Sequence, residues 1–194
     1  MAILLGKDGL VLSADSRGTI GDPRRLTAIN DSMRKLFKLN EYAGIVTYGQ
    51  AELAAQMIVE VQKEVGPDVK IPSLTDVARQ VLRSRFQEWF KNVAVDGRPV
   101  LGFILGGIDE KGAPRAYYLS SPLDFAPQLV TTGVALGGVP QYATYLAHRL
   151  YNPEMTRQNL LALAIYLISE TATQDPKVGG PIRAAEIPVD GKYS

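Results

Sequence analysis

The sequence predicts an α+β protein with two mainly antiparallel sheets stacked face to face and pairs of helices outside them. Three observations lead to this fold class. The elements run as strands, two helices, strands, two helices and a final strand. An Asp-Gly turn lies between apolar runs near the start, and the apolar period then changes from two residues to that of a helix. The strict strand–helix alternation that is typical of a parallel sheet is absent.

The first third of the chain favours strand pairs joined by tight turns. Lys7-Asp8-Gly9 is a strong hairpin signal, Gly21-Asp22-Pro23 a second turn, and Asn40-Glu41 a third. The strands expected around these turns are residues 2–5 with 10–14, 17–20 with 26–29, and 35–39 with 42–48.

Two helices are expected next. Leu53, Met57, Val61 and Val65 form one apolar stripe at helical spacing, which the Gly-Pro-Asp sequence at 66–68 ends. A second helix opens near residue 73, with Ser73 as the candidate N-cap and Asp76 three residues later.

The second half repeats the order of the first. Strands are expected at 99–108, 116–119, 128–132 and 182–187, and glycines at 133, 137 and 138 lead into a helix. Thr156 caps a last helix that reaches about Gln174, and its apolar run at 160–168 predicts burial on more than one side. Residues 1–194 are therefore interpreted as a single domain.

Composition excludes several classes of function. With 46% hydrophobic and 21% charged residues and a net charge of +1, the chain is expected to fold as a soluble domain without affinity for nucleic acid or an anionic membrane. The absence of cysteine excludes disulfides and thiolate sites, and the single histidine, His148, argues against zinc or a Ser-His-Asp triad. No cofactor or metal is expected. The lack of cysteine suits a cytoplasmic protein, and the apolar runs are too short for a membrane span or signal peptide.

Four short segments carry the candidate chemistry. A strand at 9–17 ends in Asp15-Ser16-Arg17, Lys35 begins a later strand, residues 47–51 join a strand to a helix, and Asp175 follows the last helix. Taken singly, each has an ordinary structural interpretation, such as a salt bridge at a strand end, a surface lysine or a turn glycine.

Together, in this order and spacing, these segments resemble the proteasome β-subunit family over essentially the whole chain. The resemblance implies a four-layer αββα sandwich, the fold of N-terminal-nucleophile hydrolases. It also implies a threonine-type endopeptidase that takes polypeptide substrates and works as an enclosed, ring-shaped homo-oligomer. The chain has no long N-terminal helix and so looks like the β type rather than the α type. Nothing in the sequence indicates the ring size, an α-type partner or an ATPase.

The resemblance also implies roles for individual residues. Lys35 would lie beside the nucleophile, Asp15 would pair with Lys35, and Arg17 would support Asp15. Asp175 would orient the N-terminus, and the Gly49 backbone N–H would face the developing oxyanion. On the substrate side, Thr19 would hydrogen-bond the extended chain, and the pocket for the residue before the cut, expected to be apolar, would be lined by Met33, Thr47 and Ala51.

The sequence departs from the family pattern in two ways. The nucleophilic threonine is expected about two residues before Met1 and is not in the printed chain, where removal of Met1 would expose Ala2. Two serines that the family places near the nucleophile correspond to Val134 and Val178. Three functions therefore stay open: a peptidase with a threonine ahead of Met1, a non-catalytic ring or scaffold subunit, and a related amidase acting on a small amide.

Overall fold

The computed structural model describes residues 1–21 and 27–194, and one of its sheets contains the start of the chain. This sheet has the order β10-β1-β2-β11, and all of its neighbours are antiparallel. Its strands are β1 (Ala2–Gly6), β2 (Gly9–Ala14), β10 (Val134–Leu136) and β11 (Arg183–Pro188).

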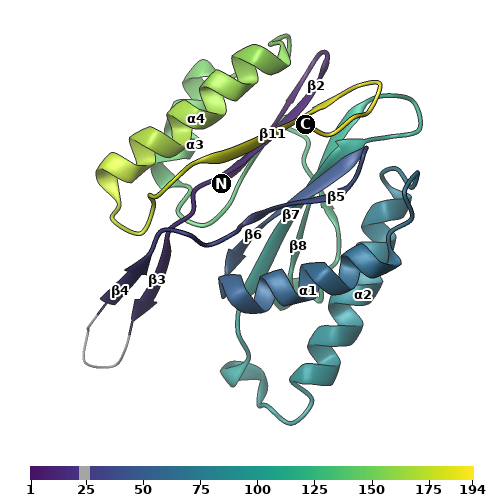
Figure 1. Ribbon diagram of the computed structural model, residues 1–194, viewed down its shortest axis with the longest axis vertical. Coiled ribbons are helices and arrows are strands. Elements are labelled where there is room, and N and C mark those ends of the chain that lie inside the picture. Colours follow the sequence, from purple (N-terminus) through teal and green to yellow (C-terminus); the bar gives the residue numbers. More distant parts are fainter. Residues whose placement is uncertain (22–26) are drawn as a thin grey trace.

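The second sheet has the order β5-β6-β7-β8-β9 and is also antiparallel throughout. Its strands are β5 (Leu36–Asn40), β6 (Ala43–Gly49), β7 (Leu101–Ile108), β8 (Pro114–Ser120) and β9 (Gln128–Leu129). The sheets stack on each other, and a helix pair covers the outer face of each (Figure 1). Helices α1 (Ala51–Glu64) and α2 (Ser73–Trp89) cover the second sheet, and α3 (Gln141–Leu150) and α4 (Arg157–Gln174) cover the first.

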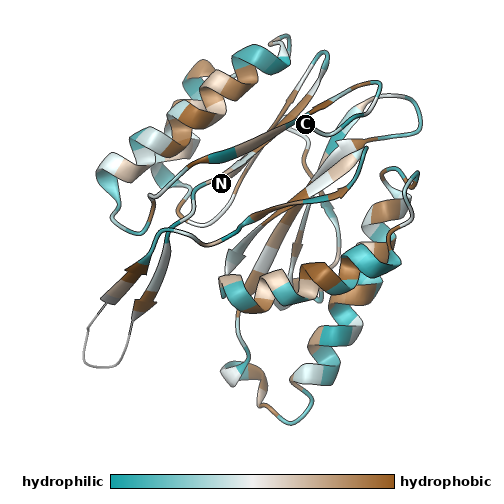
Figure 2. Cartoon of the chain, viewed as in Figure 1, coloured by the Kyte–Doolittle hydropathy of each residue, from teal (hydrophilic) through white to brown (hydrophobic). Residues whose placement is uncertain are grey.

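Alternation along the strands explains why the layers stack this way. Successive side chains of a strand point to opposite faces, so a strand that is apolar on both faces can be covered twice. In β1, Ile3 packs between the two sheets and Leu4 packs under α3 and α4. In β6, Val46 faces the other sheet and Ile45 faces α1 and α2. The apolar colouring of the strands in Figure 2 reflects this burial on two sides. The predicted α+β fold class is confirmed.

Several local predictions agree with the structure. Thr156 is the N-cap of α4, its side chain accepts a hydrogen bond from the Asn159 backbone N–H, and the helix ends at Gln174 as expected. No helix of the described residues is long and apolar enough to cross a membrane.

Other local predictions were wrong. Ser73 is the first residue of α2 rather than its cap, because Pro72 occupies the N-cap position and no side chain caps the helix. The segment between Gly133 and Gly137, expected only to lead into a helix, contains the strand β10, which pairs with β1. The apolar run of α4 does agree with its prediction, because the helix packs against both the first sheet and α3, while Ile165 and Tyr166 are 40% and 42% exposed.

Strands β3 (Gly18–Gly21) and β4 (Thr27–Asn30) form a separate antiparallel hairpin. It projects from the sandwich near the N-terminal end of the chain (Figure 1). Its strands lie within one residue of those predicted, whereas the predicted turn at 21–23 falls largely outside the described residues. The hairpin matters for function because Thr19 and Ile20 line the cavity described next.

Candidate active site

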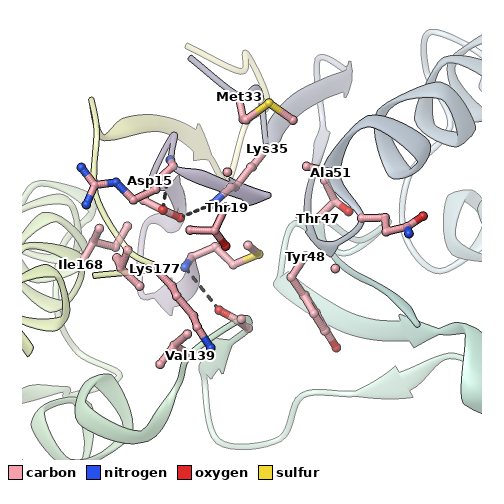
Figure 3. A pocket seen from close by; sticks show the side chains of 18 of the residues that line it. Asp15, Thr19, Met33, Lys35, Thr47, Tyr48, Ala51, Val139, Ile168 and Lys177 are labelled. Atoms are coloured by element: carbon pink, nitrogen blue, oxygen red, sulfur yellow. Dashed lines mark hydrogen bonds and ion pairs between the residues drawn. The ribbon is translucent and has the colours of Figure 1, made fainter. Parts of the chain in front are cut away.

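A cavity of about 770 Å³ opens between the base of the β3–β4 hairpin, the start of α1 and the loop that leads into α3 (Figure 3). The elements that meet there are far apart in the sequence, and they bring Met1, Asp15, Lys35, Gly49, Gly137 and Val178 to its walls.

The centre of the cavity wall is a buried ion pair between Asp15 and Lys35. The Lys35 Nζ donates to Asp15 Oδ1 at 2.8 Å, and the two side chains are only 11% and 4% exposed. The second carboxylate oxygen accepts from the backbone N–H groups of Arg17 and Gly179, each at 3.3 Å. The Lys35 carbonyl accepts from the Thr47 N–H at 2.9 Å, which fixes the lysine backbone on β6. These contacts hold one cation and one anion at a fixed place in the cavity.

The Arg17 side chain turns to a different carboxylate from the one expected. Its guanidinium donates to both oxygens of Asp31, at 2.7 and 2.9 Å, and to the Pro176 carbonyl at 3.1 Å. These hydrogen bonds raise the pKa of Arg17 and lower that of Asp31. Only the Arg17 backbone N–H contacts Asp15. Asp31 was not predicted from the sequence. The available signal was that this carboxylate lies in the same short loop as Met33 and Lys35.

Gly49 ends β6 and lines the cavity in a conformation that favours glycine. Its φ is 97°, and a Cβ placed there would lie 2.4 Å from the Val100 carbonyl oxygen. The sharp turn directs the chain into α1, which begins at Ala51. Its expected role towards an oxyanion stays a prediction.

The four residues predicted to bind substrate all line this cavity, but they differ in exposure. Thr47 is fully buried, and its hydroxyl donates to the Gly102 carbonyl at 3.2 Å. Thr19 is exposed on the hairpin, and Met33 packs against Gly18 at the hairpin base. Ala51 begins α1 on the opposite wall (Figure 3). The structure thus brings these residues together while leaving their roles as predictions.

Asp175 and Val134 do not line the cavity. Asp175 caps the end of α4, where its carboxylate accepts from the Lys177 backbone N–H at 2.8 Å, and it lies in a separate hollow beside Gln141. Val134 lies in β10 opposite Leu4, and both side chains therefore pack towards α3 and α4. Its expected place beside the nucleophile was wrong, because residues 136–140 form this wall instead. Val178 does line the cavity.

The first residue of the printed chain also lies in this cavity. The α-amine of Met1 donates to the Gly137 carbonyl at 3.4 Å. Burial lowers the pKa of this amine from 8.0 to about 6; the Asp15 carboxylate opposes the shift and the Lys35 cation adds to it. Any residue joined ahead of Met1 would be attached to this amine.

The described residues offer no grouping of three or more histidine, cysteine, aspartate and glutamate side chains that would hold a metal ion. The cavity wall itself brings together a fixed cation, a fixed anion and the amine of Met1.

Comparisons with known proteins agree on one family. The family profile described as "Proteasome subunit" matches residues 4–187. The proteasome subunit beta of Streptomyces griseus is 26% identical over 188 residues, which cover 92% of this chain and 62% of that relative. The chain therefore spans less than two thirds of that protein's length. The subunits of Methanosphaera stadtmanae and Archaeoglobus profundus are 24% and 25% identical, and the matches cover 83% and 84% of their lengths and 95% and 98% of this chain.

A solved structure supports the fold. The chain from the helical assembly of the Anbu complex of Pseudomonas aeruginosa superposes with a TM-score of 0.81 at 20% identity. The match covers 100% of this chain and 85% of that chain.

Proposed function

Because this chain belongs to the proteasome subunit family, we propose that it is a threonine-type endopeptidase whose nucleophile lies ahead of Met1. The observation that carries this proposal is the buried Asp15–Lys35 ion pair on the wall of the cavity. Burying two charges costs several kcal/mol per ion in desolvation, of the order of what their attraction returns, so such a pair is a poor means of stabilising a fold. A fixed cation beside a reactive amine lowers the pKa of that amine, and the neutral amine can then act as the base that activates a nucleophile.

The cavity suits an amine that acts as a base. A general base works best when its pKa lies near the working pH. Burial already lowers the pKa of the Met1 amine to about 6, and the Lys35 cation acts in the same direction. The same two effects on the amine of a preceding threonine would keep part of it neutral near pH 7.

The proposed reaction has two steps. The threonine hydroxyl gives its proton to the threonine's own α-amine, and its oxygen attacks the carbonyl carbon of the peptide bond. Charge develops on the carbonyl oxygen, which the Gly49 N–H would face. The C–N bond breaks, the amine product takes the proton, and an ester joins the enzyme to the acyl part of the substrate. Water then attacks the ester, which releases the carboxylic acid and restores the hydroxyl.

The cavity walls support an extended substrate with an apolar residue before the cut. Thr19 is exposed on the projecting hairpin, where its backbone and hydroxyl are accessible to a substrate chain. Met33 and Ala51 bring apolar side chains to the same cavity. An amidase that acts on a small amide would not need binding residues for an extended chain.

A second candidate function is a non-catalytic ring or scaffold subunit. It is favoured by Val178, which lines the cavity at a position where the family resemblance implied a serine. A valine has no hydroxyl with which to polarise the amine or a water molecule.

The chain is also proposed to assemble with copies of itself. The outer faces of α3 and α4 expose Tyr142, Tyr145, Ile165 and Tyr166 at 40–60%. Aromatic residues gathered on one face are typical of protein–protein interfaces. A ring and a cytoplasmic location remain predictions.

Two measurements test the proposed activity. N-terminal sequencing of the native protein would show which residue precedes Met1. The chain would also be produced with threonine residues ahead of Met1, released from a cleavable fusion, and its oligomer assayed with fluorogenic peptides that carry an apolar residue before the cut.

Hydrolysis is expected, together with a loss of at least about 100-fold in Lys35→Met, since that change removes the cation beside the amine. Lys38→Met is the matched control, because Lys38 lies on the adjoining strand and pairs with the surface residue Glu41. An inactive, folded parent chain would favour the scaffold function instead.

A further inference from the structure

Two tyrosines from different strands contact the short segment at 136–137, whose backbone is hydrogen-bonded to Met1. Tyr48 lies in β6 and Tyr118 in β8, and both are partly buried against the core between the sheets. Tyr48 lies within the segment 47–51 but was given no role there, and Tyr118 belongs to none of the motifs identified in the sequence. Both contact the segment at 136–137, which joins β10 to the loop ahead of α3.

The Tyr48 ring lies against two glycines. Gly102 is its direct cross-strand partner, and a Cβ on Gly102 would lie 2.0–2.5 Å from ring atoms of Tyr48. A Cβ on Gly137 would lie 2.8 and 2.9 Å from the Cδ1 and Cε1 atoms of the same ring. Real side chains do not approach this closely, so the ring requires glycine on both sides. The ring therefore fills the space between β7 and Gly137, and Tyr48 is among the residues that line the cavity (Figure 3).

The Tyr118 hydroxyl fixes the adjacent residue. It donates to the Leu136 carbonyl at 3.2 Å and accepts from the Leu136 N–H at 2.8 Å. One side chain thus satisfies both backbone groups of the last β10 residue. Burial raises the pKa of this hydroxyl above its ordinary value, so the hydroxyl keeps its proton and remains a donor across the neutral range.

Gly137 passes this constraint to the start of the chain. Its N–H donates to the Met1 carbonyl at 3.2 Å, and its carbonyl accepts from the Met1 nitrogen at 3.4 Å. This pair of bonds continues the β1–β10 ladder by one residue, from Ala2–Leu136 to the edge of the cavity. The position of Gly137 therefore sets where the main chain enters the cavity.

We infer that Tyr48 and Tyr118 are positioning residues, which hold the backbone at 136–137 and thereby place the group ahead of Met1 against Lys35. The inference rests on the proposed function for its effect on catalysis. A displacement of about 1 Å in a nucleophile can lower a rate by about 100-fold. Tyr48 acts on Gly137 and Tyr118 on Leu136, and the hydrogen bonds of the Asp15 and Lys35 side chains go to each other and to the backbone N–H groups of Arg17 and Gly179.

The kinetic test uses the chain with threonine restored ahead of Met1. Tyr118→Phe keeps the ring and removes the hydroxyl, and it is expected to lower kcat by about 10-fold or more with KM changed less than about twofold. Tyr48→Ala should act alike, while Tyr48→Phe retains the ring and should restore the parent kcat. Tyr117→Phe is the matched control, because Tyr117 adjoins Tyr118 on β8 but packs towards α1 and α2.

Hydrogen exchange separates this inference from the proposed function. In the chain as printed, the Gly137 amide should exchange at least about 10-fold faster in Tyr118→Phe than in Tyr117→Phe, because local opening sets the exchange rate. Faster exchange supports the positioning role even where no chain cleaves peptides, an outcome that would reject only the proposed activity. Unchanged Gly137 exchange in Tyr118→Phe, or a kcat equal to that of Tyr117→Phe in an active enzyme, overturns the inference.

Discussion

Replacing Lys35 by methionine removes the cation that faces the Asp15 carboxylate but keeps a side chain of similar length. Asp15 is 4% exposed, so it cannot recover its hydration without local opening. The carboxylate keeps its two backbone N–H donors, from Arg17 and Gly179, and the Met1 amine lies close enough to interact with it electrostatically.

The expected cost follows from this geometry. Removing one partner of a buried ion pair typically costs about 3–5 kcal/mol, because the other charge is left uncompensated. The remaining donors place Lys35→Met near the lower limit, at about 3 kcal/mol in the free energy of unfolding. For a chain of this size, that corresponds to a fall of roughly 6–12 °C in the melting temperature.

Urea unfolding at pH 7 measures this change in the parent, Lys35→Met and the double variant Asp15→Asn with Lys35→Met. The double variant should recover about 1–2 kcal/mol, because it removes the stranded charge. Lys38→Met should cost about 1 kcal/mol or less, since the Lys38–Glu41 pair is 41% and 56% exposed. A cost for Lys35→Met equal to that of Lys38→Met would refute the argument that the cavity holds a desolvated charge pair.

Three further changes test other parts of the structure. In a chain prepared to begin at Met1, the amine's pKa falls from 8.0 to about 6 on folding. The unfolded chain then binds more protons between these values, so stability should rise by about 2 kcal/mol from pH 6 to pH 8. Acetylating the amine should abolish that rise in a urea series; an unchanged rise would assign it to another group. Gly49→Ala should cost about 2–3 kcal/mol, because φ is 97° and its Cβ would meet the Val100 carbonyl. Gly97→Ala, whose Cβ has only an ordinary contact at 3.5 Å, should change thermal stability little, and equal effects would contradict the strain at Gly49. Tyr166→Glu should lower the mass measured by light scattering, since a charge would enter the proposed α4 interface; an unchanged mass would place the interface elsewhere.

Local signals in the sequence were enough for the element order and several boundaries. Thr156 caps α4 because a hydroxyl at that position satisfies a free backbone N–H, which depends on neighbours in the chain. Alternation in β1 and β6 likewise placed apolar side chains on both faces of each strand, as stacked sheets covered by helices require. The fold class followed from these regularities, and the resemblance supplied the pairing of Asp15 with Lys35.

Contacts between distant segments were beyond the reach of such signals. The short β10 strand forms because β1 offers it backbone partners more than a hundred residues away, and its register turns Val134 towards α3 and α4. Arg17 pairs with Asp31 because folding places both beside the loop after α4. The apolar run of α4 predicted burial on several sides, but only the packing shows that Tyr166 faces outward.

The sequence by itself determined the elements, their order and the charged residues available for chemistry, because propensity and periodicity are properties of neighbouring residues. Tertiary structure decided which backbone groups and side chains meet in the cavity. Which groups meet depends on strand register and on how closely distant segments approach each other, as in the contact between Tyr48 and Gly137. Neither property can be recognised from a pattern of neighbouring residues.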